Sequence, residues 1–96
     1  MIDETVGVIE SVDFLLKREN IVIEIKKTRS SLGAKEIGDQ LIIDIGRYKK
    51  HPACRTLVCF VYDPEFRIGK PAELEDDLSG QQDTMDVHVV VSPGRG

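Results

Sequence analysis

The sequence predicts an α/β (α+β) domain in which helices flank a mixed central β-sheet. Two short β-branched segments, residues 12–17 and 21–26, meet at a polar connection, as in a β-hairpin. Residues 34–50 carry apolar side chains at helical spacing, and the apolar run 56–62 follows them. A hairpin that leads into a strand–helix–strand crossover gives a sheet with both antiparallel and parallel neighbours.

Local signals predict the remaining elements. Residues 5–11 form a further strand before the hairpin. Pro71 opens a second helix at a first-turn position where proline is tolerated, and acidic residues there suit the positive end of the helix dipole. Residues 87–91 form the last strand. The run 56–62 is almost wholly apolar, which is typical of a strand covered on both faces.

The composition is that of a single globular domain spanning residues 1–96. The chain is 41% hydrophobic and 31% charged, which allows one modest core. Its longest apolar runs reach about six residues, whereas a membrane helix needs roughly 20, so we expect no membrane partner. The N-terminus carries no pattern of a cleavable leader, and we expect a cytoplasmic protein.

The charge balance sets a limit on nucleic-acid binding. The net charge is −4, whereas proteins that hold duplex DNA usually carry a basic stripe. Basic residues gather between Lys26 and Lys50, and acids gather between Glu73 and Asp77. We therefore expect the isolated domain to bind DNA weakly.

The cysteines and histidines do not form a zinc pattern. Cys54 lies beside a proline at a predicted loop, and Cys59 lies in an apolar run where a buried thiol is expected. His88, in the last strand, is expected to be an ordinary strand residue rather than a catalytic base.

The hairpin is expected to bring two acids together. In the register that makes the two apolar faces coincide, Asp13 lies directly opposite Glu24, with Cβ atoms roughly 4.5–5.5 Å apart. Lys26 projects from the same face about 6–7 Å further along. A slip of one residue would turn the isoleucine face toward the charges, so burial of the apolar face should fix this register.

Paired carboxylates and a lysine suit metal-assisted hydrolysis of a phosphodiester. Neighbouring carboxylates repel unless a cation or a shared proton resolves the conflict. Mg²⁺, with Mn²⁺ as a substitute, takes such oxygens together with water and phosphate oxygens, and Lys26 could orient the attacking water. The same residues could instead form an ion-pair cluster on a solvated sheet face. The predicted helix packs on a sheet face, so at least part of this charged face should lie in a groove and not in open water.

The order Asp13, ten residues, Glu24, one residue, Lys26 resembles the PD-(D/E)xK signature of the restriction-endonuclease-like superfamily, with Val12 in place of its proline. The stretches V-D-F-L-L-K, I-V-I-E-I-K-K-T-R, I-G-D-Q-L-I-I-D-I-G-R-Y and T-L-V-C-F-V-Y-D-P resemble a bacterial branch grouped with GATC-cutting type II restriction endonucleases. The similarity begins at about residue 8 and covers nearly all of the remaining chain. It implies a restriction-endonuclease-like core, often found at the C-terminus of a longer protein.

The resemblance implies a Mg²⁺-dependent endonuclease that acts on DNA. Asp13 and Glu24 match the metal-binding acids, the Ile25 carbonyl matches the usual backbone ligand, and Lys26 matches the catalytic lysine. Double-strand cleavage would suggest a homodimer. Related cores begin with a helix that this sequence lacks, so the fragment alone could be inactive.

Further residues are candidates for accessory roles. Gln40, Asp44 and Tyr48 form one polar stripe on the helix 34–50, where related nucleases place polar residues over the active site; a solvated helix face is the alternative. Glu10 is the nearest upstream acid. Thr28 and Arg29 could contact the DNA backbone or belong to an ordinary loop.

A second hypothesis keeps the fold without the catalysis. In it the domain is a non-catalytic protein- or nucleic-acid-interaction module, and the acid pair is structural. The acidic balance and the missing first helix favour this reading.

Overall fold

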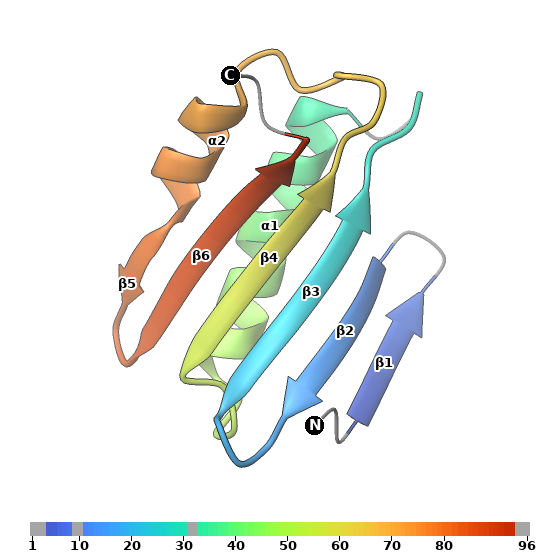
Figure 1. Ribbon diagram of the computed structural model, residues 1–96. Coiled ribbons are helices and arrows are strands. Elements are labelled where there is room, and N and C mark those ends of the chain that lie inside the picture. The colour runs from blue at the N-terminus through green and yellow to red at the C-terminus, as the bar shows by residue number, and fades with distance from the viewer. Residues whose placement is uncertain (1–3, 9–10, 31–32, 94–96) are drawn as a thin grey trace.

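Six strands form one mixed sheet in the computed structural model, which describes residues 4–8, 11–30 and 33–93. The strands are β1 (Glu4–Val8), β2 (Ser11–Leu16), β3 (Ile21–Lys27), β4 (Thr56–Tyr62), β5 (Gly80–Gln82) and β6 (Met85–Ser92). Their order across the sheet is β1-β2-β3-β4-β6-β5 (Figure 1). The pairs β3–β4 and β4–β6 are parallel and the others are antiparallel, which confirms the predicted mixed sheet.

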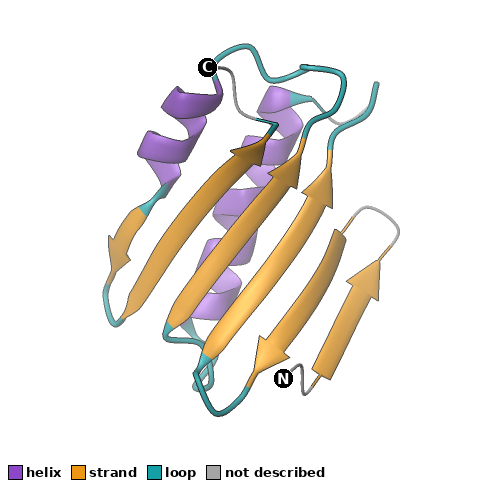
Figure 2. Cartoon of the chain, viewed as in Figure 1, coloured by secondary structure: helices purple, strands orange, loops and turns teal. Residues whose placement is uncertain are grey.

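Two helices lie together on one face of this sheet (Figures 1 and 2). Helix α1 (Ala34–Lys49) follows Gly33, whose backbone N–H donates to the Glu36 carboxylate at 3.0 Å and so satisfies one of the free donors at the helix start. Helix α2 (Pro71–Leu78) opens on its proline, as predicted. The predicted span of the first helix is confirmed to within one residue.

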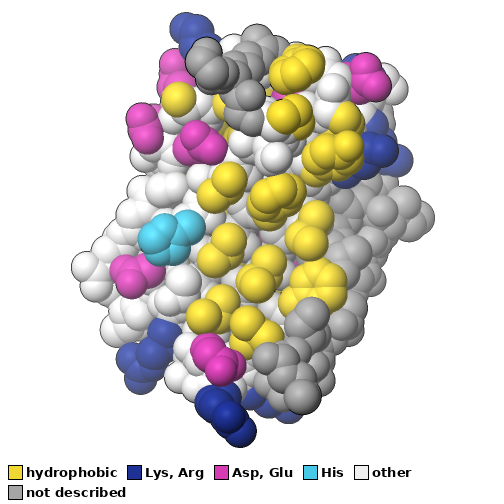
Figure 3. Space-filling view, in the orientation of Figure 1, with side chains coloured by type: hydrophobic (Ala, Val, Ile, Leu, Met, Phe, Trp, Pro, Cys, Tyr) yellow, Lys and Arg dark blue, Asp and Glu magenta, His cyan; other side chains and the backbone are white. Residues whose placement is uncertain are grey.

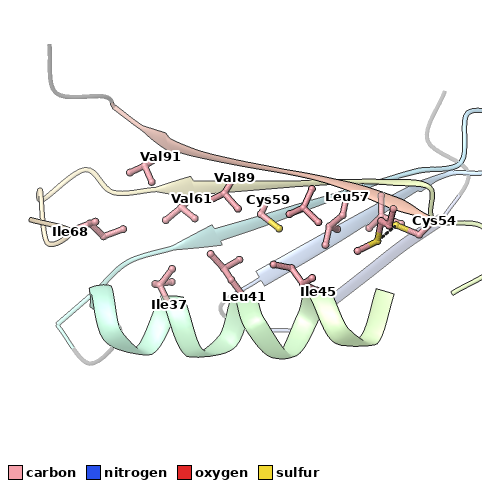
Figure 4. Packing of buried hydrophobic residues seen from close by; sticks show 13 residues of the cluster. Ile37, Leu41, Ile45, Cys54, Leu57, Cys59, Val61, Ile68, Val89 and Val91 are labelled. Carbon is pink, nitrogen blue, oxygen red and sulfur yellow. Dashed lines mark hydrogen bonds between the residues drawn. The ribbon is translucent and has the colours of Figure 1, made fainter. Parts of the chain in front are cut away.

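The hydrophobic core lies between the sheet and the helices. Ile37, Leu41 and Ile45 repeat at helical spacing on α1 and point toward Leu57 and Cys59 of β4 (Figure 4). Alternate residues of β6 complete the layer, namely Met85, Val87, Val89 and Val91. Full burial of one such side chain is worth about 1.5–3 kcal/mol, so these contacts hold α1 at a fixed height over the sheet.

The opposite face of the sheet is open in the described residues. On β4 the side chains of Leu57, Cys59 and Val61 are buried, while Tyr62 is 43% exposed. Apolar side chains gather along the middle of this open face (Figure 3). The prediction that 56–62 is covered on both faces is therefore wrong for the described chain, because both helices pack on the same side.

Other departures from the sequence prediction are local. Strand β5 was not predicted; its three residues pair antiparallel with β6. The first predicted strand, 5–11, corresponds to β1 and the first residue of β2. No helix in the described residues is long and apolar enough to cross a membrane.

Candidate functional site

The hairpin β2–β3 has the predicted register. Asp13 pairs with Glu24, and Ser11 pairs with Lys26. The connection turns at Asn20, whose φ of 59° is a left-handed conformation that asparagine tolerates. The Asn20 carbonyl accepts hydrogen bonds from the N–H groups of Arg55 and Thr56 at 2.8 and 3.1 Å. These bonds tie the turn to the start of β4 and help to hold the hairpin in place.

The acids and the lysine face α1 and are buried. Asp13 is 6% exposed, Glu24 1% and Lys26 5%, while Ile25, which points to the open face, is 38% exposed. The predicted register is therefore correct, but burial of the isoleucine face is not what fixes it. The face that carries the charges is the covered one, and the isoleucine face is the open one.

The polar stripe of α1 lies directly over this group. Lys26 Nζ donates to Gln40 Oε1 at 3.2 Å and lies 3.0 Å from Asp44 Oδ2. The Tyr48 hydroxyl donates to Asp13 Oδ2. All three residues of the predicted stripe thus contact residues of the hairpin, because the Ile37–Ile45 core contacts fix the rotation of the helix.

Arg47 is a member of the group that sequence reasoning did not place there. Its Nη2 lies 3.3 Å from Asp13 Oδ2, 3.5 Å from Asp44 Oδ1 and 3.9 Å from Glu24 Oε2. Its guanidinium carbon also lies 4.8 Å from the centre of the Tyr48 ring. The available signal was its position three residues after Asp44, on the same side of the helix.

The carboxylates of this group are incompletely satisfied. Asp13 Oδ1 and both carboxylate oxygens of Glu24 accept no hydrogen bond in the described structure. Burial, and next the nearby Asp44 carboxylate, raise the pKa of Glu24 to about 8, although Lys26 opposes the shift. Burial and the hydrogen bond to Asp13 raise the pKa of Tyr48, so its hydroxyl remains a donor.

The donor set has the chemistry of a hard-cation site. Carboxylate oxygens are the ligands that Mg²⁺ prefers, and one or two carboxylates per ion are common. Among residues 4–8, 11–30 and 33–93, however, no group of three His, Cys, Asp or Glu side chains is arranged to hold a metal ion. A cation here would thus depend on the acid pair, with water or backbone oxygens completing its shell.

Thr28 is buried rather than turned toward solvent. Its hydroxyl donates to Asp63 Oδ1 at 2.6 Å. Asp63 also accepts from the N–H groups of Arg67 and Ile68 at 2.8 and 2.9 Å, and so organises the loop after β4. The Thr28 hydroxyl is therefore committed within the protein and is not displayed for DNA, whereas Arg29 is exposed.

The remaining candidates have other surroundings or lie outside the described structure, except that Cys59 lies beside Glu24 on the neighbouring strand. Glu10 lies outside the described residues. His88 is exposed on the open face of the sheet. Cys54 and Cys59 are free and buried, and burial raises the pKa of the Cys54 thiol to about 11, which leaves it uncharged.

Comparison with known proteins identifies a family. No curated protein and no solved structure matches the chain significantly. A family model described as REase_DpnII-MboI matches residues 1–94, which is nearly the whole chain. The chain therefore belongs to the DpnII-MboI family of GATC-cutting type II restriction endonucleases, as the sequence resemblance implied.

Proposed function

We propose that this domain hydrolyses DNA phosphodiester bonds with a divalent cation, Mg²⁺, held by Asp13 and Glu24. One observation supports this most directly: the two acids are opposed, buried, and carry three oxygens without a hydrogen bond. Unpartnered buried oxygens are costly in a folded protein. A cation between them would remove that cost, and the family's action on DNA supplies the substrate class.

Each residue around the acids would then have a defined role. A bound Mg²⁺ would polarise the phosphodiester and activate a water molecule. The Ile25 carbonyl, between Glu24 and Lys26 in the chain, is the proposed backbone ligand. Lys26 would orient the water or the phosphate, and its contacts with Gln40 and Asp44 keep its ammonium beside the acids. Tyr48 would fix the orientation of Asp13.

The test is cleavage of duplex DNA that contains GATC sites, with and without Mg²⁺ or Mn²⁺. The native domain should cut only with the cation. Glu24→Gln should lose at least about a hundredfold in rate, since the loss of one group that stabilises charge in a transition state costs about 2.7–4 kcal/mol in enzymes. Asp39→Asn removes an exposed carboxylate from helix α1 and should cut like the native domain. Equal rates for Glu24→Gln and Asp39→Asn would exclude this proposal.

The setting of the domain is part of the same proposal. We propose that residues 1–96 form a single nuclease domain of a longer bacterial cytoplasmic protein. Cleavage of both strands at one site would suggest a homodimer, so we propose that two copies act together on one DNA site.

A non-catalytic interaction module is the second candidate. The observation that favours it is that the acids already have cationic neighbours, Lys26 and Arg47, while the net charge of the whole chain is −4. Calorimetric titration with Mn²⁺ separates the two. Binding heat that disappears in Asp13→Asn supports the nuclease, and an absence of heat from the native domain supports the module.

A further inference from the structure

Arg47 is the exposed member of an otherwise buried charge cluster. The side chains of Asp13, Glu24, Lys26 and Asp44 are at most 11% exposed, whereas that of Arg47 is 59% exposed. Its guanidinium contacts all three carboxylates of the cluster from the solvent side. A solute that approaches the acids from there meets Arg47 first.

The formal charges of the fully ionised cluster indicate how Arg47 and a cation would compete. Three carboxylates against Lys26 and Arg47 leave a formal charge of −1 when every group is ionised. Without Arg47 the formal charge would be −2, which a divalent cation would balance. The guanidinium and the cation therefore compete for the same carboxylates.

Release of Arg47 would cost little once a cation takes its place. Arg47 keeps most of its surface in water, whereas its carboxylate partners are buried and would be left unpaired unless the cation neutralised them. Once released, a guanidinium at the rim of the cluster matches the geometry of a phosphate group, which it can bind through two parallel hydrogen bonds.

We propose that Arg47 occupies the place of the cation in the metal-free domain and becomes a phosphate-positioning residue when the cation binds. This inference rests on the proposed function, because it needs a cation at Asp13 and Glu24. The cation would displace the Arg47 guanidinium, and the displaced side chain would contact a DNA phosphate.

The first experiment is calorimetric titration of Mn²⁺ into the native domain, Arg47→Met and Lys49→Met. Lys49→Met is the matched control. It removes the same charge from the same turn of α1, but Lys49 pairs with Asp83 and not with the acids of the cluster. Arg47→Met should bind Mn²⁺ about fivefold more tightly than Lys49→Met, which corresponds to a competing ion pair of about 1 kcal/mol. Equal affinities of the two variants would overturn the proposal.

The second experiment is binding of labelled GATC duplex in Ca²⁺ by the same variants and by Arg47→Lys. Arg47→Met should weaken DNA binding at least about fivefold more than Lys49→Met, and Arg47→Lys should restore only part of the loss because it lacks the planar fork. Tighter metal binding with weaker DNA binding is a pattern that damage to the fold would not produce. DNA binding equal to that of Lys49→Met would overturn the phosphate role.

The two proposals fail in different ways. If the native domain binds no Mn²⁺, the metal site itself is wrong, and the role of Arg47 is wrong with it. If the native domain binds Mn²⁺ and cuts DNA but Arg47→Met behaves like Lys49→Met, only the role of Arg47 is wrong.

Discussion

Lys26 Nζ lies 3.0 Å from Asp44 Oδ2, and this contact joins the end of β3 to the third turn of α1 beneath the protein surface. The ammonium also donates to Gln40 and lies 3.7 Å from Glu24 Oε1. A buried ion pair does not guarantee extra stability, but removal of one partner leaves the other charged and unsatisfied. The loss of Lys26 should therefore be costly whether or not the domain is an enzyme.

Lys26→Met should destabilise the domain by about 3–5 kcal/mol, because Asp44 and Glu24 would lose their buried cationic partner. Urea unfolding measures the change. Lys35→Met is the matched control: Lys35 pairs with Asp39 at 2.9 Å on the exposed side of α1, and its loss should leave the free energy of unfolding nearly unchanged. Similar losses for the two variants would contradict the buried role of Lys26.

Tyr48→Phe should cost about 1.5–3 kcal/mol, since it removes a hydrogen bond to a charged, buried carboxylate and leaves Asp13 with one partner fewer. Thermal or urea unfolding gives the value. Tyr62→Phe removes the same hydroxyl from a half-exposed strand residue on the open face and should change stability by less than about 0.5 kcal/mol. If Tyr48→Phe were as mild as Tyr62→Phe, the hydroxyl of Tyr48 would not hold Asp13.

The stability of the metal-free domain should depend on pH through Glu24. Its pKa is raised from 4.5 to about 8, chiefly by burial, so the folded state favours the protonated form. The protonated carboxyl stabilises the fold below pH 4.5, and this contribution is lost as the pH rises toward about 8. Urea unfolding in EDTA between pH 5 and 9 should show the decline.

Glu24→Gln provides the control for that decline, because the amide has nearly the same shape and does not ionise. The variant should lose stability less steeply than the native domain over the same pH range. Parallel curves would mean that Glu24 does not ionise within this interval in the folded state.

The register of the hairpin could be predicted from sequence because it depends on local alternation and on the length of one turn. The helix stripe of Gln40, Asp44 and Tyr48 was also readable, since periodicity fixes which residues share a side. Which sheet face the helix covers was not readable, because that choice depends on the crossover and on the β4 and β6 side chains together. The isoleucine face of β3 therefore looked like the buried one.

The contacts of Arg47 and Asp63 were missed for a related reason. Arg47 resembles any basic residue in the last turn of a helix, where the helix dipole favours a positive charge. Asp63 precedes a proline and resembles a strand-ending residue. Only the packing of α1 over β2 and β3 brings Arg47 to the acids, and only the neighbouring ends of β3 and β4 bring Thr28 to Asp63.

Asp63→Ala should destabilise the domain by about 2–5 kcal/mol, more than Thr28→Val, which should cost about 1–2 kcal/mol. The alanine variant leaves the buried Thr28 hydroxyl and the N–H groups of Arg67 and Ile68 without their acceptor, whereas Thr28→Val removes one donor only. Amide hydrogen exchange at Ile68 should accelerate in Asp63→Ala and change little in Thr28→Val. Asp77→Ala, at an exposed acid of α2, serves as the control and should leave stability and exchange unchanged. Equal losses in Asp63→Ala and Thr28→Val would show that the carboxylate does not organise the loop after β4.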